Sequence, residues 1–195
     1  NNGRYLNDDS SDSWDISKAV FQQSSNNFLV SLSGTSTSNR GLYNLWTVDE
    51  FGTILSKSRW RVGTWMSSQY GSEWGFVDEI TGVLDNNNDG LVDSASNYQL
   101  FSEGKAVYLH NDTGKALSDR SNGRWNVTQS VKTASGFQVL LEGQNSKADM
   151  YQVWSTNDFG LFTNTTGFKS DSWMAQNSYE SIFGVDFNED GIYSP

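Results

Sequence analysis

The chain has 195 residues, a formal net charge of −10 and no cysteine. This length suits one large domain or two small ones, and the lack of cysteine excludes disulfides and thiolate metal sites. The sequence has no basic run, which excludes nucleic acid as a partner because a phosphate backbone attracts clustered Lys and Arg. It also has no apolar run long enough for a membrane span. There is no initiator Met and no signal peptide, so we expect an excised or processed part of a longer protein.

Short β-strands are expected along most of the chain. Aromatic residues make up 14% of it and include 8 Trp, which is typical of a β-protein with a substantial core and many polar turns. Alternation such as Phe28-x-Val30-x-Leu32 indicates a half-buried strand. The expected strands are residues 14–21, 28–32, 43–47, 106–110, 125–132, 137–141 and 161–165. Residues 49–52 and 157–160 each end in Gly and predict hairpin turns.

Two short helices are expected, each leading into an acidic loop. Tyr179, Ile182 and Phe183 fall on one helical face, and Ser172 is a candidate N-cap for this segment. The same spacing rule gives a second helix through Val77, Ile80 and Leu84. The sequence therefore predicts strands, then a helix, then a loop, twice over.

An internal repeat organises these elements into two units. Four pairs recur in the same order, namely Trp14 with Trp125, Phe28 with Phe137, Trp46 with Trp154 and Trp65 with Trp173. We therefore expect an α+β, mainly β chain of two tandem repeats, at residues 1–96 and 97–195. Each would be an antiparallel β-meander followed by a short helix and an acidic calcium loop of the EF-hand or dockerin kind.

The acidic loops are the candidate metal sites, at residues 85–96 and 186–195. Oxygen-bearing side chains at every second position, followed by Gly, suit a hard cation such as Ca²⁺. The candidate ligands are Asp85, Asn87, Asp89, the Leu91 carbonyl and Asp93 in the first loop, and Asp186, Asn188, Asp190 and the Ile192 carbonyl in the second. The alternative is a pair of ordinary Asn/Asp turns with a left-handed Gly.

Neither loop carries the bidentate Glu of a full EF-hand at its twelfth position. Ser96 occupies that position in the first loop, and the second ends at Pro195 before reaching it. Glu79 and Glu180 each lie six residues before the first loop Asp and are candidates to complete the shell. As helix residues they could equally face solvent or cap a backbone amide.

The sequence gives little support for an enzyme. His110 is the only His and is expected at the surface, and neither a nucleophile elbow nor a phosphate-binding loop is present. The paired tryptophans are expected in the core. Trp60 and Trp74 have no Trp partner in the second unit and are candidates for stacking on a sugar ring.

One family resemblance rests on a series of motifs in the second unit. These are Trp125, the strand 135–139, Tyr151 to Trp154, Gly160, Ser172-Trp173, Glu180 and the segment 183–191. In this order they resemble the tryptophan-rich C-terminal domain of cyanobacterial and other bacterial surface and haemolysin-type calcium-binding proteins. The first unit resembles that domain more loosely, with Thr81-Gly82 where the second has Ile182-Phe183.

The resemblance implies a part of a large exported protein, calcium as the ligand, and no established enzymatic activity. We therefore expect a calcium-binding structural or adhesive module, extracellular or at the cell surface. Its possible partners are cell-surface glycans or other domains of the same protein. The alternative is a calcium-dependent carbohydrate-binding, lectin-like module.

Overall fold

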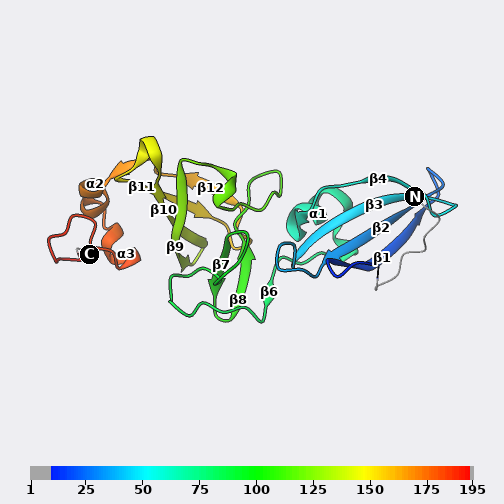
Figure 1. The fold of residues 1–195 in the computed structure, drawn as a ribbon, viewed down its shortest axis with the longest axis horizontal. Coiled ribbons are helices and arrows are strands. Elements are labelled where there is room, and N and C mark those ends of the chain that lie inside the picture. Colours follow the sequence, from blue (N-terminus) through cyan, green and yellow to red (C-terminus); the bar gives the residue numbers. More distant parts are fainter. Residues whose placement is uncertain (1–9, 194–195) are drawn as a thin grey trace. The chain divides into compact units, whose positions relative to one another are not determined.

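The computed structural model describes residues 10–193 and is mainly β, with three antiparallel sheets and few helices. Its contacts divide the chain into two compact units (Figure 1). Unit 1 runs up to Ile80 and includes Thr113–Lys115, and unit 2 holds the remainder from Thr81 onward. Within the described range, no helix is long and apolar enough to cross a membrane.

Unit 1 is built on one twisted antiparallel sheet, here called sheet 1, with a helix against it. Its strands are β1 (Trp14–Gln22), β2 (Asn27–Gly34), β3 (Leu42–Asp49), β4 (Ile54–Lys57) and β5 (Arg61–Val62), in the order β1-β2-β3-β4 with β5 also on β3. They are followed by α1 (Gly63–Tyr70) and the 3₁₀ turn η2 (Ser72–Trp74). Leu45, Met66 and Phe76 form the core between this segment and the sheet. The predicted strands 14–21, 28–32 and 43–47 are confirmed.

Unit 2 contains a five-stranded antiparallel sheet and a hairpin. The hairpin is β7 (Gln99–Ser102) and β8 (Lys105–Tyr108), joined in a small sheet by β6 (Ile80–Thr81), whose second residue begins the unit. The main sheet, sheet 2, contains β9 (Trp125–Thr133), β10 (Gly136–Gly143), β11 (Met150–Thr156), β12 (Phe162–Thr165) and β13 (Lys169–Ser170). The chain then forms α2 (Asp171–Gln176) and α3 (Tyr179–Phe183), with 3₁₀ turns η3 (Asp119–Ser121) and η4 (Asn145–Lys147) earlier in the unit. These strands and α3 agree with the predictions.

Both faces of sheet 2 are covered, because its strands carry apolar side chains on each face. Phe137, Val139 and Leu141 point to the face where Leu100 and Leu109 lie, in and after the β7–β8 hairpin. The other face carries Leu140 and Val153, which pack against Met174, Phe183 and Phe187 from the C-terminal helices and the residues after them. Figure 1 shows both layers, with the hairpin beside β9 and the two helices at the C-terminal end of the unit.

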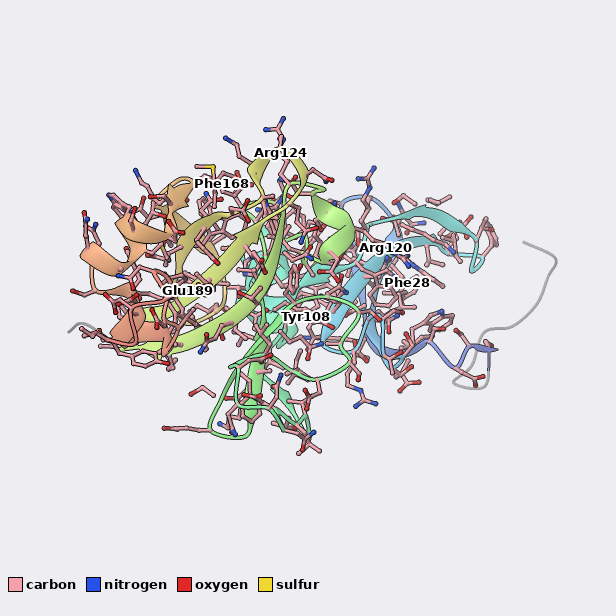
Figure 2. All side chains as sticks on the ribbon, turned by 60° about the vertical axis from the view of Figure 1, so that its left-hand side comes forward. Phe28, Tyr108, Arg120, Arg124, Phe168 and Glu189 are labelled. Atoms are coloured by element: carbon pink, nitrogen blue, oxygen red, sulfur yellow. The ribbon has the colours of Figure 1, made fainter. Side chains whose placement is uncertain are left out.

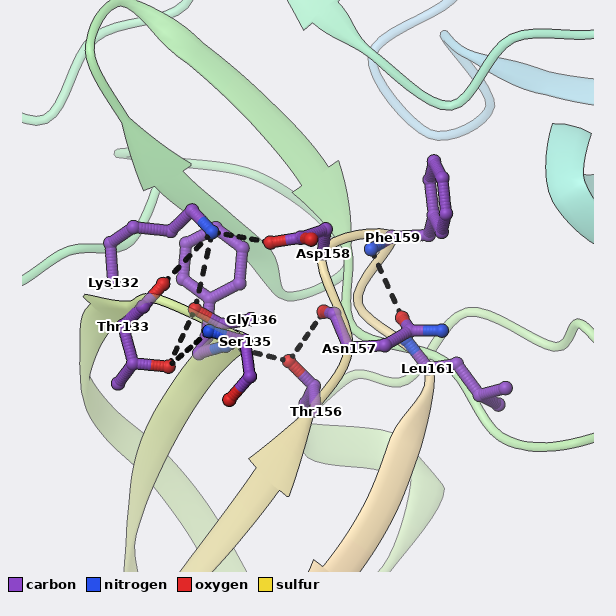
Figure 3. Close-up of polar contacts among 10 residues, drawn as sticks. Lys132, Thr133, Ser135, Gly136, Thr156, Asn157, Asp158, Phe159 and Leu161 are labelled. Carbon is purple, nitrogen blue, oxygen red and sulfur yellow. Dashed lines mark hydrogen bonds and ion pairs between the residues drawn. The ribbon is translucent and has the colours of Figure 1, made fainter.

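The β3–β4 and β11–β12 turns have the same structure, as predicted. Gly52 and Gly160 adopt φ values of 82° and 78°, which glycine tolerates without a Cβ clash. In the second turn, Asn157 Oδ1 accepts hydrogen bonds from the amides of Phe159 and Leu161, both at 3.0 Å (Figure 3). Asp49 does the same in the first turn. These side chains satisfy backbone donors that a tight turn leaves without strand partners.

The helix predicted through Val77, Ile80 and Leu84 is wrong. Residues 75–79 have no regular structure, β6 follows at Ile80, and Gly82 turns the chain with φ 69°. Val77 and Leu84 are exposed, so their spacing did not mark a buried face. The helix of unit 1 is α1, earlier in the chain, where Met66 is fully buried.

Two further details differ from expectation. The N-cap of α2 is Ser170, whose side chain accepts the Trp173 amide, and not Ser172. The compact units divide at Ile80, so the first acidic loop falls within unit 2, whereas the repeat pattern divides the chain after residue 96. Residues 1–9 and 194–195 lie outside the described range, including the start of the expected first repeat and the end of the second loop.

Candidate metal sites in two acidic loops

Loop 1, here residues 85–93, folds around its own side-chain oxygens. Asp85 accepts the amides of Asp89, at 3.2 Å, and of Gly90, at 2.9 Å. Asn87 Oδ1 accepts the Asp89 amide at 3.4 Å, and Asp89 Oδ1 accepts the Leu91 amide at 2.8 Å. The side-chain oxygens at positions one, three and five of the loop thus each accept a backbone amide of the loop itself.

Loop 1 is also fastened to the strands of unit 2. The Ser130 amide on β9 donates to the Asp89 carbonyl at 2.7 Å, and the Ser130 hydroxyl donates to the Gly90 carbonyl. The Phe101 amide on β7 donates to the same Gly90 carbonyl at 2.7 Å. Sequence reasoning missed Ser130, which is buried although alternation along β9 groups it with the polar Asn126 and Thr128, opposite Trp125 and Val127. No local pattern in the sequence therefore marks this residue.

Loop 2, here residues 186–192, reproduces the internal hydrogen bonds of loop 1. Asp186 accepts the amides of Asp190, at 3.2 Å, and of Gly191, at 2.8 Å. Asn188 Oδ1 accepts the Asp190 amide at 3.0 Å, and Asp190 Oδ1 accepts the Ile192 amide at 2.7 Å. The same residue types at the same spacing therefore give the same local structure in two different surroundings.

The two candidate glutamates occupy different environments. Glu180 in α3 is fully buried; its Oε1 accepts the Phe187 amide at 3.0 Å, and its Oε2 has no hydrogen-bond partner within residues 10–193. Glu79 is exposed, belongs to unit 1 and lies in the irregular segment before β6, not in a helix. Glu180 is thus joined to the backbone of loop 2, and the two residues are not structural equivalents.

The Asp side chains of the loops do not form a cluster of three or more with other acidic, His or Cys side chains among the described residues. In residues 10–193, no group of three or more His, Cys, Asp or Glu side chains is placed to hold a metal ion. Asp93 is turned to the start of loop 1, where its Oδ2 accepts the Asn86 amide at 2.8 Å. Leu91 and Ile192 occupy the seventh positions, where a calcium loop uses the backbone carbonyl.

The residues considered for other chemistry belong to segments outside the two loops. Trp60 and Trp74 are half-buried in unit 1, and Trp74 stacks on Phe76 with ring centroids 6.0 Å apart. His110 is buried in unit 2, which corrects the expectation of a surface residue. Its Nδ1 lies 2.9 Å from the Asn111 carbonyl, and its buried Nε2 has no partner. Neither acidic loop shares a unit with the two tryptophans.

Comparison with known proteins adds no relative. No protein-family model matches the chain, and searches of curated proteins and of solved structures give no match either.

Proposed function

We propose that this chain is a calcium-binding structural module of an exported or cell-surface protein, with two tandem tryptophan-rich repeats. The observation that supports it best is that both acidic loops have the same internal network. Asp85 and Asp186, Asn87 and Asn188, and Asp89 and Asp190 make matching contacts to backbone amides.

The donor set of each loop fits Ca²⁺. All side-chain donors at positions one, three and five are oxygens, which is the ligand type that hard cations prefer. A carboxylate oxygen has two lone pairs, so one can accept a backbone amide while the other faces an ion. Beside loop 2, the buried Glu180 supplies a further carboxylate whose Oε2 has no hydrogen-bond partner among the described residues. An ion there would offset the repulsion between neighbouring carboxylates.

The proposed role is stabilisation and not catalysis. A ligand that binds only the folded chain raises its stability by RT ln(1 + [L]/Kd). Extracellular calcium modules bind with Kd values of about 10⁻⁴ to 10⁻³ M. At about 5 mM calcium, each loop would then add roughly 1 to 2 kcal/mol to the free energy of unfolding.

Thermal unfolding in calcium and in chelator tests this proposal. For a chain of this size, each kcal/mol raises Tm by roughly 2 to 4 °C, so two loops would add several degrees. Asp85→Asn and Asp186→Asn should each remove part of the increment. Asp112→Asn makes the same charge change at an exposed residue outside the loops and should leave it intact. An equal Tm in calcium and chelator would refute the proposal.

A further inference from the structure

Sheet 1 has an apolar face that the described residues leave partly open. Phe21 on β1 lies opposite Phe28 on β2, and Val30 lies opposite Trp46 on β3. Residues directly opposed in an antiparallel pair share a face. Phe21 and Phe28 remain 45% and 37% exposed, and Ile16 on the same face is 38% exposed. This open face is the one turned away from α1, whose core uses Leu45 on the other side of β3.

The corresponding face of sheet 2 shows what covers such a surface. Phe137, Val139 and Leu141 alternate along β10 as Phe28, Val30 and Leu32 do along β2, and they are buried. Their cover is the β7–β8 hairpin together with the end of loop 1, whose Leu91 packs against the same cluster. In sheet 2, an acidic loop and the aliphatic residue at its seventh position therefore form part of the layer that covers this face.

Loop 2 presents a second copy of that covering element. It has the internal hydrogen bonds of loop 1, and Ile192 stands where loop 1 has Leu91. Ile192 and Tyr193 are 61% and 56% exposed. The charges also match, because Lys57 lies over the Trp46 ring at 4.2 Å beside the open face, and loop 2 carries the exposed Glu189. Figure 2 labels Phe28 and Glu189 on these two surfaces.

We propose that loop 2 of one copy of this chain docks on the open face of sheet 1 in a second copy. Ile192 and Tyr193 cover Phe21 and Phe28 there, as Leu91 covers the Phe137 cluster. The two surfaces differ, so the contact is head-to-tail and adds copies in succession instead of closing a symmetric dimer. The inference rests on the proposed function to the extent that calcium organises loop 2 for docking.

Sedimentation velocity over a range of protein concentrations tests the docking. In calcium, the wild-type sedimentation coefficient should rise with concentration through dimers to longer oligomers. Phe28→Asp places a charge on the open face of sheet 1 and should prevent docking there. Ile192→Asp places a charge on loop 2 and should prevent this loop from docking. Each variant alone should stay monomeric, whereas an equimolar mixture should form a heterodimer and nothing larger, because each variant keeps one working surface.

Control variants separate docking from folding and from calcium binding. Val20→Asp is a matched control for Ile16→Asp, because both residues lie on β1 and are 38% exposed but face opposite sides of the sheet. Val20→Asp should preserve assembly, and Ile16→Asp should abolish it. Calorimetric titration of Phe28→Asp should show wild-type calcium binding, because Phe28 lies in unit 1 and outside both loops.

The possible outcomes distinguish the two proposals. A wild-type chain that binds calcium but stays monomeric at every concentration overturns the docking and leaves the proposed function intact. Dimerisation of Ile192→Asp alone also overturns it, because this would be a face-to-face contact. Assembly by the same residues without any calcium binding supports the docking and refutes the proposed function.

Discussion

Gly90 and Gly191 provide a matched pair for testing how loop 1 is attached to unit 2. Both occupy the sixth loop position, with φ values of 79° and 76°. A methyl group on either residue costs about 1 to 2 kcal/mol because the left-handed region disfavours a Cβ. A Cβ at Gly90 would also lie 1.9 Å from the Ser130 carbonyl oxygen, whereas one at Gly191 would meet no described residue within 4 Å.

The two alanine variants should therefore differ clearly in stability. To relieve the clash at Gly90, loop 1 must move away from β9 and weaken its hydrogen bonds to Ser130 and Phe101. Each such bond contributes about 0.5 to 1.5 kcal/mol. We expect Gly90→Ala to lower the free energy of unfolding by about 3 to 6 kcal/mol, and Gly191→Ala by only about 1 to 2 kcal/mol.

Urea denaturation in chelator measures this difference without a contribution from calcium. Tryptophan fluorescence reports the transition, and linear extrapolation gives the free energy of unfolding for each variant. A Ser130→Ala variant should lose only the hydroxyl contact, at a cost of about 0.5 to 1.5 kcal/mol that lies well below the cost of Gly90→Ala. Equal destabilisation by Gly90→Ala and Gly191→Ala would refute the attachment of loop 1 to β9.

Three further predictions concern side chains of unit 2. Glu180→Ala should cost about 1 to 3 kcal/mol in urea denaturation, because it leaves the Phe187 amide without its acceptor, whereas Glu79→Ala at an exposed position should stay within about 0.5 kcal/mol. Asn157→Ala should lower Tm by removing the acceptor for two turn amides, at a cost of about 1 to 2 kcal/mol; an unchanged Tm would contradict the turn structure. Burial raises the pKa of Tyr98. The folded chain therefore keeps a proton that the unfolded chain loses above about pH 10, so the free energy of unfolding should fall there. Urea midpoints measured between about pH 9 and 11 should fall less in Tyr98→Phe than in the wild type.

The strands could be predicted because their pattern is local. Phe28-x-Val30-x-Leu32 and Phe137-x-Val139-x-Leu141 alternate with a period of two, and each forms a central strand. The helix prediction failed at Ile80 because apolar spacing over a few residues does not distinguish a helix from an irregular segment that enters a short strand. Gly82 lies inside the segment predicted to be helical, and a glycine at such a position argues against a helix.

The surroundings of the loops could not be predicted from the loops themselves. The sequences 85–91 and 186–192 predict the same turn, and both form it. Glu180 contacts loop 2 only seven residues further along the chain and could be proposed from the sequence, whereas the contact of Ser130 with loop 1 joins residues 40 apart. A contact over such a separation requires the strand register, which no local motif specifies.

These different surroundings imply different dependence on an ion. Loop 1 is held by hydrogen bonds from β7 and β9 to its own carbonyls, so it has attachments that persist without calcium. Loop 2 is joined to α3 through Glu180, a buried carboxylate with one oxygen unpartnered, and burying such a charge without full compensation is costly. We therefore expect chelation to open α3 and loop 2 before loop 1, and amide hydrogen exchange should show faster exchange at residues 180–192 than at residues 85–93. The reverse order would mean that the attachment to Ser130 contributes less than the Glu180 contact.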